Sequence, residues 1–533
     1  MKNKIYINDW LTLKPYKNNT NVDIYFLKLS NQVKNELYKK DFLQKISFLL
    51  DEETVNLMCC FIVSYFEDLI SETNIWNSFI KKHIELYNKP LPFYEIDEYY
   101  ENEINPEDIS FLIWYFLNTI QTKTFINPYN AYINDIAEAI YSIFDNEWEV
   151  APENENLKSY YKINENEEDY YTAREFMNKI LFRTYLFYFD TGIRLSNSEI
   201  EILKEFSDND NIHLYFKENI DESLFRYSTC LLGLKAQEWA SLIVSNSQTL
   251  SKRFLNISQR ISGSFFYKGQ DNSFIFLEHI ASGKKFNLIK KSFDFSETLN
   301  EIDKIIHMGI VRWMDEWWFS GIQFEIPFDA DYILDEKNSV EKRMSVNFLD
   351  FKSKAVEELL DNQLRIFKKN NDGKQIVFMP LKKVNQFLND FNNSYNKSLK
   401  LSEKASKEAQ ERRKKEGLNS DNNFSLLEGD TDEEALVFYN PKTGCEIAFD
   451  LNSAFPMPEN PFYSEEKSEE HIMKLFIDPS ISKELVEFCL ENCTTKIPYL
   501  LNGVGKYLLK DIDFLLRFWK KGSYHSVPSV TVI

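Results

Sequence analysis

The sequence predicts an α+β protein of several domains: a helical N-terminal domain, a small SH3-like or OB-like β-barrel, and a C-terminal α/β domain with an inserted linker. Three observations predict this class. The chain has 533 residues, which is too long for one hydrophobic core. Apolar residues recur at helical spacing up to about residue 255. Five short runs rich in β-branched and aromatic residues then follow, between residues 260 and 328.

The helical domain is predicted over residues 1–255. One buried stripe is indicated by apolar residues at helical spacing, namely Val55, Met58, Cys59, Ile62, Phe66 and Leu69. A helix start is predicted at Asn105, because Pro106 suits a first turn and two acids favour its positive end. Ser196 to Glu199 matches a capping box after a predicted helix end at Gly192, so a new helix is expected there.

The barrel is predicted over residues 256–335. Short turns containing Gly and Asn separate its first three runs, which favours antiparallel neighbours and a meander. Closing the sheet on itself would remove most exposed edges, and an SH3-like barrel is preferred to an OB-like one. The predicted strands are 262–268, 273–279, 285–290, 305–314 and 317–326.

The C-terminal α/β domain is predicted over residues 336–400 and 435–533. Residues 401–434 separate the two parts and are predicted to be a charged flexible linker, because few large apolar side chains occur there. Each part contains too few strands for a sheet of its own, so strands on either side of the linker are expected to pair. The expected strands are 375–379, 435–439 and 445–449.

Charge and cysteine content limit the environment and the partners. The 83 acidic and 62 basic residues give a net charge of −21, which disfavours nucleic acid and anionic membranes as partners and leaves protein as the favoured one. Six cysteines in so long a chain do not form a disulfide framework, which indicates a reducing compartment. The first ten residues lack the apolar segment of a signal peptide, and no apolar run is long enough to span a bilayer. A cytoplasmic protein is therefore expected.

Aromatic residues at the last predicted hairpin form the candidate binding site, which consists of Arg312, Trp313, Trp317, Trp318 and Phe319. Alternation along a strand sends only some of these rings inward, so Trp313 is expected to be buried and either Trp317 or Trp318 accessible. An accessible ring would be a stacking surface for a peptide or a base. The alternative is that all the rings complete the core or a domain interface.

No catalytic, cofactor-binding or metal-binding residue is assigned. Cys445, His471, Cys489 and Cys493 could supply zinc ligands, but their spacing is not that of a zinc knuckle, and buried structural cysteines are the preferred interpretation. Carboxylates beside a lysine could hold Mg²⁺ in a nuclease, but they are too close together and are interpreted as a solvated loop after the barrel. They are Asp329, Asp331, Asp335, Glu336 and Lys337.

Several stretches resemble an uncharacterised family of bacterial proteins, a domain of unknown function common in gut anaerobes. They are LPFYEIDEYYENEINPEDISFLIWYFLN, FDNEWEVAPEN, FLEHIASGKKFNLIKKSFD and MGIVRWMDEWWFSG. The resemblance covers most of residues 1–330. It implies a bacterial cytosolic origin and no activity, ligand or catalytic residue.

The favoured function is that of a non-catalytic protein-interaction or adaptor protein that uses the Trp-rich barrel. One alternative is a nucleic-acid-associated protein, for which the basic run from Arg412 to Lys415 would contact phosphates. The other alternative is a metal-dependent enzyme such as a nuclease. The oligomeric state is left open by the sequence.

Overall fold

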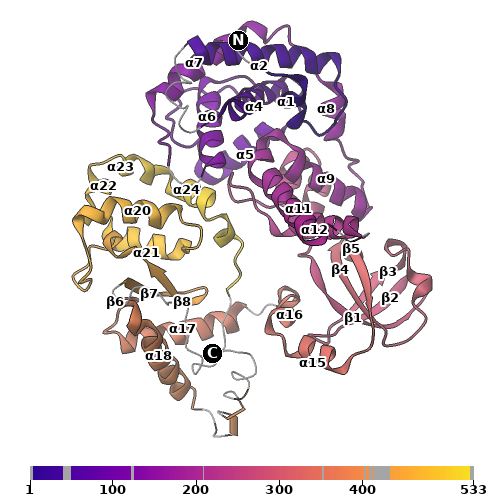
Figure 1. Ribbon diagram of the computed structural model, residues 1–533, viewed down its shortest axis with the longest axis vertical. Coiled ribbons are helices and arrows are strands. Elements are labelled where there is room, and N and C mark those ends of the chain that lie inside the picture. Colours follow the sequence, from indigo (N-terminus) through magenta and orange to yellow (C-terminus); the bar gives the residue numbers. More distant parts are fainter. Residues whose placement is uncertain are drawn as a thin grey trace. The chain divides into compact units, whose positions relative to one another are not determined.

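A computed structural model describes residues 4–39, 50–121, 125–207, 209, 211–350, 353–400, 402, 404–405, 407–408, 411 and 433–528. The chain divides into two compact units, Met1–Phe328 and Asp329–Ile533, which are treated separately below (Figure 1). Helices and strands both occur, so the mixed α+β class is as predicted. The division of the first unit into domains 1–255 and 256–335 stays a prediction, and most of the predicted linker 401–434 lies outside the described residues.

The first part of unit 1 is helical, as predicted. Helices α4 (Glu52–Ile70) and α6 (Pro106–Ile120) form its centre, because most of their side chains are buried. No single described helix is long and apolar enough to cross a membrane, although α4 and α5 (Ile75–Tyr87), bent by 86°, reach that length and composition as a pair. The other helices are α1 (Ile7–Thr12), α2 (Asn21–Lys39), α5 (Ile75–Tyr87), α7 (Ala131–Glu147), α8 (Glu155–Tyr160), α9 (Tyr170–Arg183), α10 (Tyr185–Phe187), α11 (Ile193–Phe206), α12 (Ile212–Arg226), α13 (Ala236–Ile243) and α14 (Gln248–Leu255).

Two predicted helix starts have different outcomes. Helix α6 begins at Pro106 as expected, although the Asn105 side chain bonds to the backbone of Tyr100 instead of capping its own helix. The predicted start at Ser196 is wrong, because α11 runs without a break from Ile193. Gly192 has helical backbone angles, and the Ser198 hydroxyl donates to the Leu195 carbonyl, so these serines are accommodated inside a continuous helix.

The second part of unit 1 contains all five predicted strands, but not the predicted meander. Strands β1 to β3 follow one another, whereas β3 pairs in parallel with β5 through Leu288 and Trp317. Strand β4 pairs with β5 and also returns to β1. The connection between β3 and β4 is long and contains two 3-10 turns, Lys290–Ser292 and Ser296–Thr298, so it can pass to another strand position. The strands are β1 (Ile261–Gln270), β2 (Phe274–His279), β3 (Lys285–Ile289), β4 (Ile305–Trp313) and β5 (Glu316–Ile326).

An ion pair of a buried arginine joins the helices of unit 1 to its strands. Arg260, at the start of β1, donates to Glu218 of α12 at 2.5 Å and to the Ser320 carbonyl at 3.2 Å. Gly309 and Gly321 lie against this arginine, and a Cβ at either position would collide with its guanidinium group. In Figure 1, β4 and β5 lie nearest α12, while β2 and β3 lie farther from it. The outer side of β2 and β3 is therefore left uncovered by α12.

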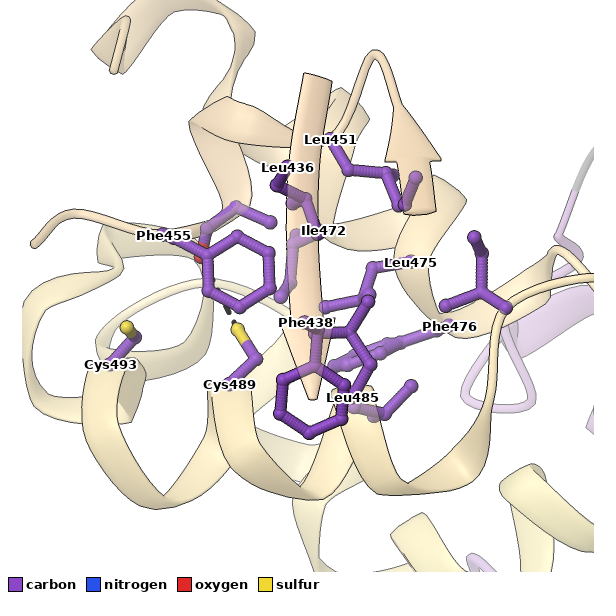
Figure 2. Close-up of a cluster of buried hydrophobic side chains, with 14 of the residues drawn as sticks. Leu436, Phe438, Leu451, Phe455, Ile472, Leu475, Phe476, Leu485, Cys489 and Cys493 are labelled. Atoms are coloured by element: carbon purple, nitrogen blue, oxygen red, sulfur yellow. Dashed lines mark hydrogen bonds between the residues drawn. The ribbon is translucent and has the colours of Figure 1, made fainter. Parts of the chain in front are cut away.

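Unit 2 is a three-stranded antiparallel sheet with helices on both faces. Strand β6 (Ile376–Pro380) pairs with β7 (Glu434–Asn440) across the predicted linker, as the sequence indicated, and β7 pairs with β8 (Gly444–Phe449). Alternate β7 residues face opposite cores: Phe438 belongs to the core shown in Figure 2, and Val437 belongs to the core on the other face. The helices are α15 (Ala330–Asn338), α16 (Val340–Met344), α17 (Ser353–Asn370), α18 (Val384–Ser398), α20 (Ser468–Ile477), α21 (Lys483–Cys493), α22 (Pro498–Leu501), α23 (Gly505–Leu508) and α24 (Ile512–Trp519).

Candidate interaction surface

The predicted aromatic site lies on the tight hairpin between β4 and β5. Met314 and Asp315 form its turn, and both have a positive φ. Arg312 pairs directly with Trp317, and these two side chains share one face of the hairpin. Trp313 and Trp318 lie on the opposite face, because neighbouring residues of a strand alternate.

Trp313 and Trp318 are buried against helices of the same unit. The Trp313 ring lies 5.5 Å from Phe254 of α14, and its indole nitrogen donates to the Glu168 carbonyl at 3.1 Å. Trp318 is only 2% exposed and packs on Tyr170 and Tyr171 of α9. Both rings therefore belong to the junction between helices and strands, which is the alternative that the sequence left open.

The other three predicted residues keep some contact with solvent. Trp317 is half-buried, with its ring 4.9 Å from Phe286, and Phe319 is half-buried beside Phe293. Arg312 is exposed. Among the predicted tryptophans of the hairpin, Trp317 is thus the accessible one, and its role in binding stays a prediction.

A larger apolar surface lies on the outer side of β1 and β2, and the sequence analysis missed it. Phe266, Phe274 and Phe276 are half-buried there, while their neighbours Phe265, Ile275 and Leu277 fill the interior. Ile302 is 62% exposed and lies beside Phe276, since both are within 3.9 Å of the position a Cβ on Gly269 would take. The outer β face is defined as Phe266, Phe274, Phe276 and Ile302 together with Lys268, Glu278, Lys285 and Asn287. Strict alternation along β2 was the signal that could have found it.

Charges on the outer β face are balanced. The Lys268 ammonium lies 2.6 Å from Asp303 and 3.8 Å from Glu278, and 5.0 Å from the Phe266 ring centre. Its hydrogen bond to Asp303 raises the pKa of Lys268. Lys285 stands directly opposite Glu278 in the sheet. The face therefore combines apolar rings with paired charges.

A shallow hollow of about 360 Å³ lies beside the start of α9. Lys162, Lys179, Tyr171 and Phe176 are among its lining residues. The Tyr171 hydroxyl donates to the Ser292 carbonyl at 2.6 Å, which ties this wall to the strand part. The hollow is small and open, and one of its two lysines lies over the ring of Tyr160.

The candidate metal ligands do not converge. In the described part of the chain, no three His, Cys, Asp or Glu side chains are placed to hold a metal ion. Cys489 and Cys493 belong to the core of unit 2, where the Cys489 thiol donates to the Ala454 carbonyl (Figure 2). His471 accepts from the Ser453 backbone N–H at 3.1 Å, and Cys445 packs against the core on the opposite face of the sheet.

The acidic cluster after the strands is a helix and not the expected loop. Asp329 caps the start of α15 by accepting from the Asp331 backbone N–H at 2.9 Å. Glu336 is buried and pairs with Lys342 of α16. The remaining members, Asp335 and Lys337, lie along the same helix, so the acids stabilise local structure.

Buried carboxylates at the centre of the helical part are held by hydrogen bonds. Asp108 accepts from the Tyr65 hydroxyl at 2.7 Å and from the Tyr99 hydroxyl at 3.1 Å. Burial raises the pKa of Asp108 from 3.8 to about 7, and these hydrogen bonds oppose the rise. Asp68 accepts from the Trp76 backbone N–H at 2.7 Å and thereby caps α5. These acids have structural partners and lie away from the outer β face.

We expect Asp108 to make unfolding depend on pH. Because its pKa is raised in the folded protein, its contribution to stability is fully present below pH 3.8 and is lost as the pH rises towards 7. Asp108→Asn removes this titration. The free energy of unfolding of the wild type relative to the variant should fall by about 2 kcal/mol between pH 5 and pH 8 in urea denaturation. Exposed Asp145→Asn is the control, and a pH-independent difference for Asp108→Asn would contradict the expectation.

One protein family matches the N-terminal half of the chain. The model of the family described as Protein of unknown function (DUF3843) matches residues 4–274, just over half of the 533 residues. The chain belongs to the DUF3843 family. The DUF3843 match takes in the helices of unit 1 and strand β1, and it confirms the resemblance to an uncharacterised family. No curated protein and no solved structure matched the chain.

Proposed function

We propose that this DUF3843 protein is a non-catalytic interaction or adaptor protein of the cytoplasm that binds a protein partner through the outer β face. The observation that supports this proposal is the apolar group formed by half-buried Phe266 and Phe276 and exposed Ile302, with charged side chains around it. Contiguous exposed apolar surface on a folded protein is typical of a binding site. Rigid aromatic rings lose little entropy on binding and therefore suit such a surface.

The strand order supports the same face. The order β1-β2-β3-β5-β4, with β4 returning to β1 and β3 parallel to β5, is that of an OB-like barrel. We therefore propose an OB-like barrel in place of the SH3-like one preferred from the sequence. Barrels of the OB type bind ligands, typically oligonucleotides and oligosaccharides, on the face of strands 2 and 3. The strand order and the apolar side chains therefore support the same surface, the outer β face.

The charges favour protein over nucleic acid as the partner. Binding a phosphate backbone requires clustered cations that are free to replace counterions. On the outer β face, Lys268 is already paired with Asp303 and Lys285 stands opposite Glu278. Balanced pairs of this kind suit the polar rim of a protein interface. The basic run from Arg412 to Lys415, on which the nucleic-acid alternative depended, lies outside the described residues.

Replacing the apolar side chains of this face should abolish partner binding without unfolding the protein. The tagged full chain would be purified from its native host, its partner identified by mass spectrometry, and the dissociation constant measured with purified components. Phe276→Ala with Ile302→Asp should weaken binding at least ~30-fold, which corresponds to the loss of an interface hot spot. Val150→Asp, at another exposed apolar residue, should leave binding unchanged.

Two results would count against the proposal. Unchanged partner binding by the double variant, with its circular dichroism spectrum intact, would exclude the outer β face. Salt-dependent binding of single-stranded nucleic acid that the same two changes abolish would favour the nucleic-acid alternative instead.

A further inference from the structure

Helix α11 has one buried face and one exposed apolar face. On the buried side, Leu195 is covered and the Ser198 hydroxyl accepts from the Asn219 amide of α12 at 2.8 Å. Phe206 on the same side stacks on Tyr215 of α12, with ring centres 4.4 Å apart. The opposite side carries three large apolar residues that are 37%, 47% and 48% exposed, namely Ile193, Ile200 and Leu203.

These three residues follow the spacing of a coiled-coil seam. Ile193 and Ile200 are seven positions apart, and Leu203 follows Ile200 by three, so they occupy positions a, a and d of two heptads. Ser196 occupies the remaining d position. A seam of this kind on the outer side of a helix that is already packed on its inner side calls for a second helix. In parallel coiled coils, isoleucine at a and leucine at d favour two strands over three or four.

We propose that α11 is a self-association surface, and that it pairs in parallel with α11 of a second copy of this chain. The charges beside the seam support this occupant. Glu199 and Lys204 hold positions g and e, which meet across a parallel two-stranded coil. Glu199 of each copy would therefore face Lys204 of the other, which gives two ion pairs related by two-fold symmetry. Lys204 is exposed, whereas Glu199 is half-buried; burial raises the pKa of Glu199, and the charge of Arg183 opposes this rise.

An antiparallel pair of α11 helices would bring like charges together. In that arrangement position g meets g and position e meets e, so Glu199 would face Glu199 and Lys204 would face Lys204. Like charges in contact oppose association. The same two residues therefore select the parallel arrangement, and they make its test specific.

The resulting dimer should be weak and concentration-dependent. Helix α11 is 14 residues long, which provides only two heptads, and Ser196 interrupts the apolar seam with a small polar side chain. An interface of this length is at the low end of specific protein contacts. We therefore expect monomer and dimer to exchange readily in solution.

Sedimentation velocity of the full chain over a range of concentrations tests the proposal. We expect a reversible monomer–dimer equilibrium. Ile200→Glu should abolish the dimer, and Lys204→Glu should weaken it roughly tenfold, because two symmetric ion pairs become two repulsive contacts. Glu199→Lys should have a similar effect. The double charge reversal, Glu199→Lys with Lys204→Glu, should restore the wild-type dissociation constant.

Ile24→Glu is the matched control, since Ile24 is a 40% exposed isoleucine on α2. It should leave association unchanged. A wild type that is monomeric at every concentration would overturn the proposal. So would a dimer whose dissociation constant Lys204→Glu leaves unchanged, since antiparallel helices would only exchange a Lys–Lys contact for a Glu–Glu contact. A double reversal that fails to restore association would also overturn it. If Ile200→Glu unfolds the chain, the dissociation constants of Glu199→Lys, Lys204→Glu and their double reversal still test whether α11 forms a parallel dimer.

Discussion

Replacing Lys14 by methionine should destabilise unit 1 by about 3–5 kcal/mol, because it leaves a buried carboxylate without its counter-charge. The Lys14 ammonium pairs with Glu67 and donates to the Ser64 hydroxyl at 3.0 Å, and both side chains of the ion pair are almost fully buried. After the substitution, Glu67 would keep only the Asn154 amide, which donates to it at 2.8 Å. Urea denaturation followed by tryptophan fluorescence would measure the loss.

A double variant separates the ion pair from the packing around it. Lys14→Met with Glu67→Leu removes both charges, so it should recover most of the stability that Lys14→Met alone loses. The loss from Lys14→Met should also shrink at low pH. Burial already raises the pKa of Glu67, and Lys14 is the main group opposing that rise, so its removal makes protonation easier. Additive losses in the double variant would contradict this account of the pair.

Trp318→Ala should cost about 3–5 kcal/mol, the usual range for removing a large aromatic side chain from a core. Its ring fills the junction between α9 and β5, where Tyr170 and Tyr171 pack on it and the Lys291 ammonium lies 4.6 Å from the ring centre. The cavity left behind would weaken the attachment of strands to helices. Urea denaturation measures the loss in the free energy of unfolding. Faster amide hydrogen exchange in α9 and β5 would show that the loss arises at the junction between them.

The neighbouring tryptophan is the natural control. Trp317 is half-buried and lies on the other face of β5, so Trp317→Ala should cost about 1 kcal/mol and leave exchange in α9 unchanged. The two variants have the same change in composition and differ only in strand face. Equal losses would mean that the hairpin contributes both rings to one core, contrary to the observed alternation.

The strands could be predicted because their signals are local. Gly283 has a positive φ in the turn between β2 and β3, and Gly269 has one at the irregularity where β1 pairs with β2. Pairing is a long-range property, and no turn residue reveals it. The return of β4 to β1 and the parallel contact of β3 with β5 depend on which faces the helices cover. The predicted meander failed for that reason.

The candidate site was harder to predict than the fold. Trp313 and Trp318 drew attention because tryptophan is common at binding surfaces, but it is as common in buried junctions. Phe266 and Phe276 could not be assigned to a surface from the sequence, because phenylalanine usually lies in a core and adjacent Phe265 and Phe266 face opposite sides of β1. The wrong helix start at Ser196 has a similar origin, because serine is common at the first position of a helix but can also occur inside one. Whether such an aromatic side chain is buried, or such a serine begins a helix, depends on tertiary contacts that the local sequence does not reveal.

The ring of strand pairings also determines where this chain can be cut. A fragment ending at residue 274, where the family match ends, would retain β1 and lose β4 and nearly all of β2, both of which bond to it. Two unsatisfied strand edges rich in phenylalanine would then face solvent, and such edges recruit other chains into aggregates. The same cut would remove Ser320 and Trp318, so Asp221 would lose the Ser320 hydroxyl and keep Arg174, and Tyr170 would lose its contact with Trp318. The shortest soluble piece that carries the family segment should therefore extend to Phe328.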